Sequence, residues 1–159
     1  MRDRTRLAGV AGVAGVVTLV AAIALYASAE AHLWAHMTQH LLLVVVAAPL
    51  LAIPLVRWRA PAPSWIVVVV WTVLHSVALW VWHLPGPFDA AVRSEPVHGL
   101  AHLSLFGTAL GFWWTAFGTV RQGVPGVGIA AVFVTTMQGI ALGGLMTLAS
   151  RPWYAGYAL

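Results

Sequence analysis

Long apolar segments that carry almost no charge are the feature that most constrains this chain. Apolar runs of about 20 residues, separated by short polar or proline-containing breaks, have the length that a helix needs to cross a bilayer. Hydrophobic residues make up 61% of the chain and charged residues only 8%, which excludes a soluble domain. We therefore expect an all-α integral membrane protein, because backbone polar groups inside lipid must be paired within each span.

The 159 residues have room for one domain, residues 1–159, with about five transmembrane helices. The expected spans are 7–29, 32–56, 65–84, 98–118 and 127–150. Pro49 and Pro54 predict a kink or a loosened hydrogen-bond ladder in the second span, with neighbouring helices covering the freed carbonyls. In the fifth span, the spacing of Gly139 and Gly143 is typical of close helix packing.

The arginines predict the orientation in the membrane. Six of them are expected on the same side of the membrane as the N-terminus, and two on the opposite side. The six are Arg2, Arg4, Arg6, Arg57, Arg59 and Arg121, and the two are Arg93 and Arg151. This asymmetry predicts a cytoplasmic N-terminus and indicates no nucleic-acid partner. A second interpretation stays open, because the basic start, the apolar run and the small residues before Glu30 also fit a cleavable signal peptide. Under either interpretation the second span begins outside.

Histidines gather on the side that is predicted to face outward. The chain has seven: His32, His36, His40, His75, His83, His98 and His102. Residues four apart share one face of a helix, so the second and fourth spans each present imidazoles in a row. Ionisable groups inside a membrane face the bundle interior or a partner, so we expect these side chains to converge as metal ligands. Interfacial placement of His32, His83 and His98, and an interhelical hydrogen bond from His75, are the plainer alternatives.

The other polar residues narrow the choice of metal. The chain has no cysteine and only four acidic residues, so thiolate sites and oxygen cages for calcium or magnesium are excluded within the spans. Imidazole with thioether favours copper, and Met37 lies within the first histidine row. Zinc and haem iron compete, and a bis-histidine haem would favour a pair such as His40 and His75. No phosphate loop or nucleophile elbow is present, so we expect no enzyme activity.

Three segments carry more specific motifs in a fixed order. They are AHMTQHLLL (35–43), LWVWHLPGPFDAAVRSEPVHGLAHLSLFGTALGFWW (79–114) and GLMTLASRPWYAGY (144–157). Together they resemble the CtaG-type cytochrome c oxidase assembly factors of bacteria. The resemblance places His36, Met37, Gln39 and His40 in one motif, His83 in the next, and His98 and His102 in the third. Members of that family usually continue into another membrane helix, so the resemblance implies a C-terminally short form.

The resemblance implies a role in the maturation of a copper-containing terminal oxidase in the bacterial plasma membrane. Its expected partners are oxidase subunits, other copper carriers and the lipid bilayer. The chain would bind copper, or hand it over, at the outer face through its histidines. Two alternatives remain: a metal-free scaffold that holds oxidase subunits together, and a small membrane cytochrome with haem between two histidines.

Overall fold

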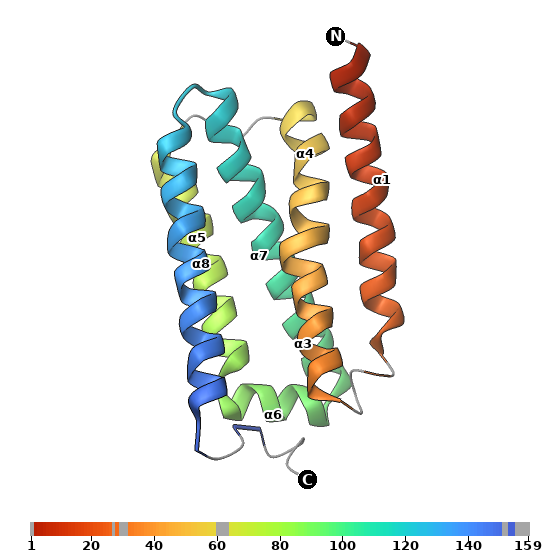
Figure 1. Cartoon of the computed structure of the whole chain (residues 1–159), viewed down its shortest axis with the longest axis vertical. Coiled ribbons are helices and arrows are strands. Elements are labelled where there is room, and N and C mark those ends of the chain that lie inside the picture. The colour runs from red at the N-terminus through yellow and green to blue at the C-terminus, as the bar shows by residue number, and fades with distance from the viewer. Residues whose placement is uncertain (1, 27, 29–31, 60–63, 151–152, 155–159) are drawn as a thin grey trace.

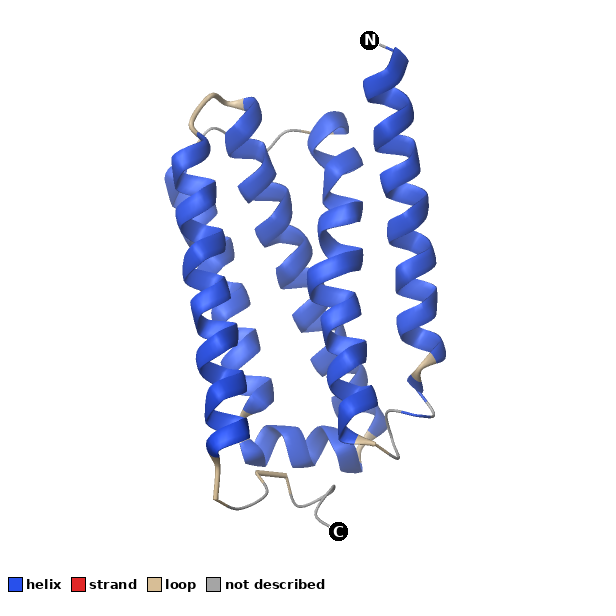
Figure 2. Cartoon of the chain, in the orientation of Figure 1, coloured by secondary structure: helices blue, strands red, loops and turns tan. Residues whose placement is uncertain are grey.

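A computed structural model of the chain consists of helices that run side by side (Figure 1). It describes residues 2–26, 28, 32–59, 64–150 and 153–154, and every regular element in this part of the chain is a helix (Figure 2). The elements are α1 (Arg2–Ala24), α3 (Leu33–Leu41), η1 (Leu42–Ala47), α4 (Ala48–Trp58), α5 (Trp65–His83), α6 (Pro85–Arg93), α7 (Glu95–Arg121) and α8 (Pro125–Leu148).

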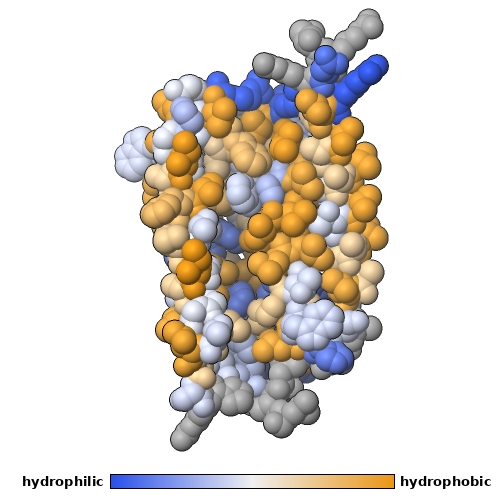
Figure 3. Space-filling model, viewed as in Figure 1, coloured by the Kyte–Doolittle hydropathy of each residue, from blue (hydrophilic) through white to orange (hydrophobic). Residues whose placement is uncertain are grey.

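Five helical segments of the described chain are long and apolar enough to cross a membrane, which confirms the predicted all-α architecture. They are Thr5–Ala24, Leu33–Trp58, Trp65–His83, Glu95–Arg121 and Pro125–Leu148. Most bounds differ from the expected ones by a few residues; the clearest differences are that α1 already ends at Ala24 and that α7 extends from Glu95 to Arg121. Large apolar side chains cover the outside of the bundle, as expected for helices that face lipid (Figure 3).

The two ends of the bundle differ in composition. The arginine end holds Arg57, Arg59 and Arg121 near the start of α1, where Arg57 donates a hydrogen bond to Thr5 Oγ1 at 3.4 Å. At the opposite end, here called the α6 end, α6 lies across the bundle (Figure 1). Which end faces the cytoplasm stays a prediction from the arginine asymmetry.

The second span loosens where its prolines predicted. Between α3 and α4, η1 adopts π-helical geometry, in which a carbonyl pairs with the N–H five residues on. The Val44 carbonyl would then face Pro49, which has no N–H to donate. The indole of Trp113 on α7 donates to that carbonyl instead, at 3.0 Å. The neighbouring helix thus covers the freed acceptor, as expected.

Neighbouring helices pack tightly against two glycines that the sequence analysis did not associate with packing. A Cβ at Gly111 would lie 2.2 Å from Trp71 on α5, and a Cβ at Gly128 would lie 2.7 Å from the Ala116 carbonyl oxygen on α7. By contrast, no described atom lies within 4 Å of a Cβ placed at Gly139 or Gly143. The prediction of close packing at that pair is therefore wrong within the described chain.

The connection between α5 and α7 is a helix, where the sequence predicted only a short link between spans. Pro85 lies in the first turn of α6, where its missing N–H leaves no helical hydrogen bond unmade. Phe88 and Ala91 share one face of α6 and are buried, whereas Gly86 and Arg93 are exposed. This amphipathic helix closes the α6 end over the histidines.

Candidate functional site

Five imidazoles from three helices meet at the α6 end. This histidine cluster comprises His36 and His40 of α3, His83 of α5, and His98 and His102 of α7. Within one helix, the ring centroids are 4.5 Å apart for His36 and His40 and 4.4 Å apart for His98 and His102. The two four-residue spacings therefore act as the sequence predicted, each aiming a pair of rings the same way.

Contacts between helices join these pairs into one group. The His40 ring lies 4.8 Å from that of His102 and 5.6 Å from that of His83, measured between centroids. The His36 ring is stacked 5.3 Å from that of His98. All five side chains are buried except that of His102, which is half-buried. The convergence of rings from three helices, expected from the cost of polar groups in lipid, is present for these five.

Hydrogen bonds orient two of the rings. Nδ1 of His83 lies 2.7 Å from the Leu79 carbonyl oxygen, and Nδ1 of His102 lies 3.2 Å from that of His98. A carbonyl oxygen can only accept, so in the neutral rings Nδ1 carries the hydrogen and Nε2 carries the lone pair. Backbone carbonyls hold metal-binding histidines in this same tautomer.

Several nitrogens of the cluster lack hydrogen-bond partners among the described residues. They are both ring nitrogens of His40 and Nε2 of His102, each shielded from solvent. A buried polar group without a partner costs free energy, so natural proteins rarely keep one unless it has a further use. These nitrogens make the cluster the candidate site for a ligand.

Aromatic side chains cover the cluster at the α6 end. Phe88 of α6 lies 5.0 Å from His36 between ring centroids, and Tyr154 stacks on Phe88 at 3.6 Å. The Tyr154 hydroxyl donates to the His83 carbonyl oxygen at 3.1 Å. Burial, together with the nearby Asp89 carboxylate, raises the pKa of Tyr154 to about 12. The sequence analysis missed both aromatic residues, although the spacing of Phe88 and Ala91 on one helical face was a usable signal.

Gln39, which belongs to the same motif as His36 and His40, has a structural contact. Its side-chain amide donates to the Ala22 carbonyl oxygen near the end of α1, at 2.9 Å. The bond links the cluster-bearing helix α3 to α1, while the Gln39 amide oxygen is buried with no partner among the described residues.

The remaining candidates lie in other surroundings. His75 is buried two helical turns from His83, where its Nδ1 lies 3.2 Å from Thr108 Oγ1 and its ring stacks on Phe112. This is the interhelical hydrogen bond that the plainer interpretation predicted. His32 is exposed at the start of α3, and Met37 is half-buried on the next turn. Their roles as ligands stay predictions.

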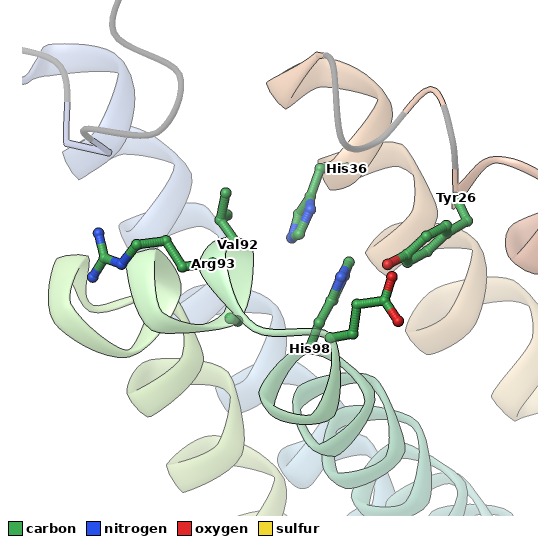
Figure 4. Close-up of a pocket in the computed structure, with 7 residues that line it drawn as sticks. Tyr26, His36, Val92, Arg93 and His98 are labelled. Atoms are coloured by element: carbon green, nitrogen blue, oxygen red, sulfur yellow. The ribbon is translucent and has the colours of Figure 1, made fainter.

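A pocket of about 140 Å³ opens beside the cluster. His36 and His98 line it together with Tyr26, Arg93 and Glu95. Figure 4 shows the His36 and His98 rings near each other, with Tyr26 to one side of them, Val92 and Arg93 to the other, and Arg93 extending away. The Tyr26 ring stacks on that of His98 at 5.4 Å. In the described part of the chain, no group of three His, Asp or Glu side chains is arranged to hold a metal ion.

These features define a class of protein: a five-span helical membrane protein with buried imidazoles gathered at one end. The family model of the cytochrome c oxidase caa3 assembly factor (Caa3_CtaG) matches residues 4–159. The chain therefore belongs to that family, which confirms the resemblance seen in its motifs and indicates a role in oxidase assembly. No curated protein and no solved structure matches it.

Proposed function

We propose that this assembly factor binds copper in the histidine cluster and hands it over during oxidase maturation, without turning over a substrate. The observation that carries the proposal is the group of five imidazoles from three helices, in which His40 and His102 have ring nitrogens without partners. The arginine asymmetry supports an orientation with the α6 end at the outer face of the plasma membrane.

The spacing of the rings suits a shared ion. With metal–nitrogen bonds of about 2.0 Å, two imidazoles on one ion have centroids roughly 5 to 6 Å apart. The centroid distances between helices in the cluster, 4.8 to 6.0 Å, fall close to this interval. Because no three ligands converge as they stand, binding requires small rotations of the rings about their side-chain bonds. Imidazole suits copper, and Met37 is the nearest thioether along α3.

The arrangement also suits transfer. An assembly factor must release its ion, so a ligand set that holds the ion very tightly would defeat the purpose. Adjacent imidazoles allow ligands to be exchanged one at a time, from His98 and His36 at the pocket to His102, His40 and His83 farther in. The recipient would be an oxidase subunit, and the donor another copper carrier.

Copper content of the purified protein tests the proposal. His40→Ala and His102→Ala should each lower copper affinity by at least about tenfold, since even groups that only orient ligands contribute that much. His75→Ala is the matched control, because it removes a buried histidine that bonds to Thr108 outside the cluster. Elemental analysis of the detergent-purified proteins, with mature oxidase measured in the same cells, gives the readout. Equal copper in all four proteins would contradict the proposal.

The same samples separate the two alternatives. A haem protein would show a Soret band, but the pocket beside the cluster measures about 140 Å³, below the roughly 300 Å³ at which sites for drug-sized ligands begin. A haem between the helices would also need space beside small residues, but the Trp71 ring fills the space beside Gly111. A metal-free scaffold would keep its association with the oxidase after both cluster variants are combined.

A further inference from the structure

The pocket beside the cluster reaches the surface between three parts of the chain. Tyr26 follows α1, Val92 and Arg93 belong to α6, and Glu95 begins α7. His36 and His98, which line the same pocket, are members of the histidine cluster. The pocket therefore joins the outside of the α6 end to the first two imidazoles (Figure 4).

Of the two charged residues that line this pocket, only Glu95 attracts a cation. Both Arg93 and Glu95 are exposed and line it, so one repels and the other attracts a positive ion. His98 is in the first turns of α7, one helical turn after Glu95. A cation held near the Glu95 carboxylate is thus one turn from an imidazole that stacks against His36 at 5.3 Å.

We propose that this pocket is the route by which the copper ion reaches the cluster, and that Glu95 draws the ion into it. The inference rests on the proposed function and adds to it the point of access. Tyr26 forms one wall, since it lines the pocket and its ring stacks on His98. An ion that enters here meets His98 and His36 before the deeper rings of His40 and His102.

A structural role for Glu95 has to be separated from this one. Glu95 is an acidic residue in the first turn of α7, where a negative charge is favourable in any helix. That role affects folding, whereas attraction of an ion affects the rate of copper uptake and depends on salt. The test therefore measures rates on the full chain together with its thermal stability.

The experiment mixes the purified full chain in detergent micelles with copper(I), supplied anaerobically as its acetonitrile complex. Uptake is followed by tryptophan fluorescence in a stopped-flow instrument. Glu95→Gln should slow uptake about threefold at low salt, the effect of one unit charge at roughly 6 Å in water. At about 1 M salt the difference should largely vanish, because the screening length falls to about 3 Å. Arg93→Gln should have the opposite effect on the rate.

Asp3→Asn is the matched control, because it removes the same charge from an exposed residue at the arginine end. Copper bound at equilibrium should be the same in all these proteins. Val92→Trp places an indole in the pocket while leaving every histidine intact, and it should slow uptake at both salt concentrations.

Three results would overturn the inference. Equal slowing by Glu95→Gln and Asp3→Asn would mean that only the net charge matters. Unchanged uptake in Val92→Trp, with the same stability as the wild type, would mean that copper enters elsewhere. In both cases the proposed function would survive. A wild-type chain that takes up no copper would overturn the proposed function together with the route.

Discussion

The two ends of this bundle treat polar groups in opposite ways. At the arginine end, Arg121 donates to the Val56 and Arg57 carbonyls in the last turn of α4, and the Trp114 indole donates to the Arg59 carbonyl. These donors satisfy acceptors that the end of a helix leaves open. At the α6 end, nitrogens of His40 and His102 are buried with no partner among the described residues.

The difference separates polar groups that serve the fold from polar groups that, under the proposed function, bind a ligand. Donors at the arginine end complete the bundle's own hydrogen bonds. At the α6 end, the unpartnered nitrogens of His40 and His102 add nothing comparable to stability, and their burial costs free energy. Replacing an imidazole with unpartnered nitrogens at the α6 end and replacing a donor at the arginine end should therefore have stability effects of opposite sign.

The largest expected effect is at the α6 end. His40→Leu should stabilise the metal-free chain by about 3 kcal/mol, because it replaces a buried ring without partners by an apolar side chain. The measurement is thermal or denaturant-induced unfolding in detergent micelles containing a chelator. His75→Leu is the control, and it should not stabilise, since His75 contacts Thr108 at 3.2 Å. A loss of stability in His40→Leu would show that the His40 nitrogens are satisfied.

The next effect, of opposite sign, is at the arginine end. Arg121→Gln should destabilise the chain by about 2 kcal/mol, because the α4 carbonyls lose a charged donor. The exposed Arg6 of α1 provides the control, and Arg6→Gln should change the unfolding temperature little. If the two variants unfold at the same temperature, the hydrogen bonds of Arg121 do not stabilise the arginine end, and the contrast between the two ends is contradicted.

The smallest effect concerns the cover of the cluster. Tyr154→Phe keeps the stack on Phe88 but removes the bond to the His83 carbonyl, which should cost about 1 kcal/mol near neutral pH.

That difference should depend on alkaline pH. The pKa of Tyr154 is raised to about 12 from an ordinary value of 10.0, so the folded chain keeps a proton that the unfolded chain loses first. The contribution is full below pH 10.0 and is lost as the pH rises through about 12. The unfolding temperature of the wild type should therefore fall to that of Tyr154→Phe and then below it over this interval. A constant difference would mean that the hydroxyl proton plays no part.

The sequence predicted the histidine cluster better than its surroundings. His36 with His40, and His98 with His102, were predicted to share a helix face because their spacing and the helical period settle that question locally. That the two pairs would meet followed from the cost of leaving them in lipid. His75 avoids the same cost by contacting Thr108 and Phe112 outside the cluster. No local sequence pattern tells a histidine that joins the cluster from one that bonds elsewhere.

The cover and the pocket were not predictable in the same way. Phe88, Tyr154 and Tyr26 come from three segments far apart in the chain, and each has an ordinary aromatic role when it is considered alone. Gln39 was noted only through its motif, and its bond to Ala22 depends on how α1 packs beside α3. Such contacts depend on helix order around the bundle, which hydropathy does not encode.

What the sequence by itself determined is the membrane-spanning helical architecture, the loosening before Pro49 and the histidine rows. These depend on the bilayer as solvent and on the period of one helix, so each follows from a short stretch of chain. Only the tertiary structure decided which imidazoles meet, that α6 and Tyr154 cover them, and where a pocket reaches them. Those features arise from packing between distant segments, where the same apolar surface can be buried in several arrangements and close contact selects one.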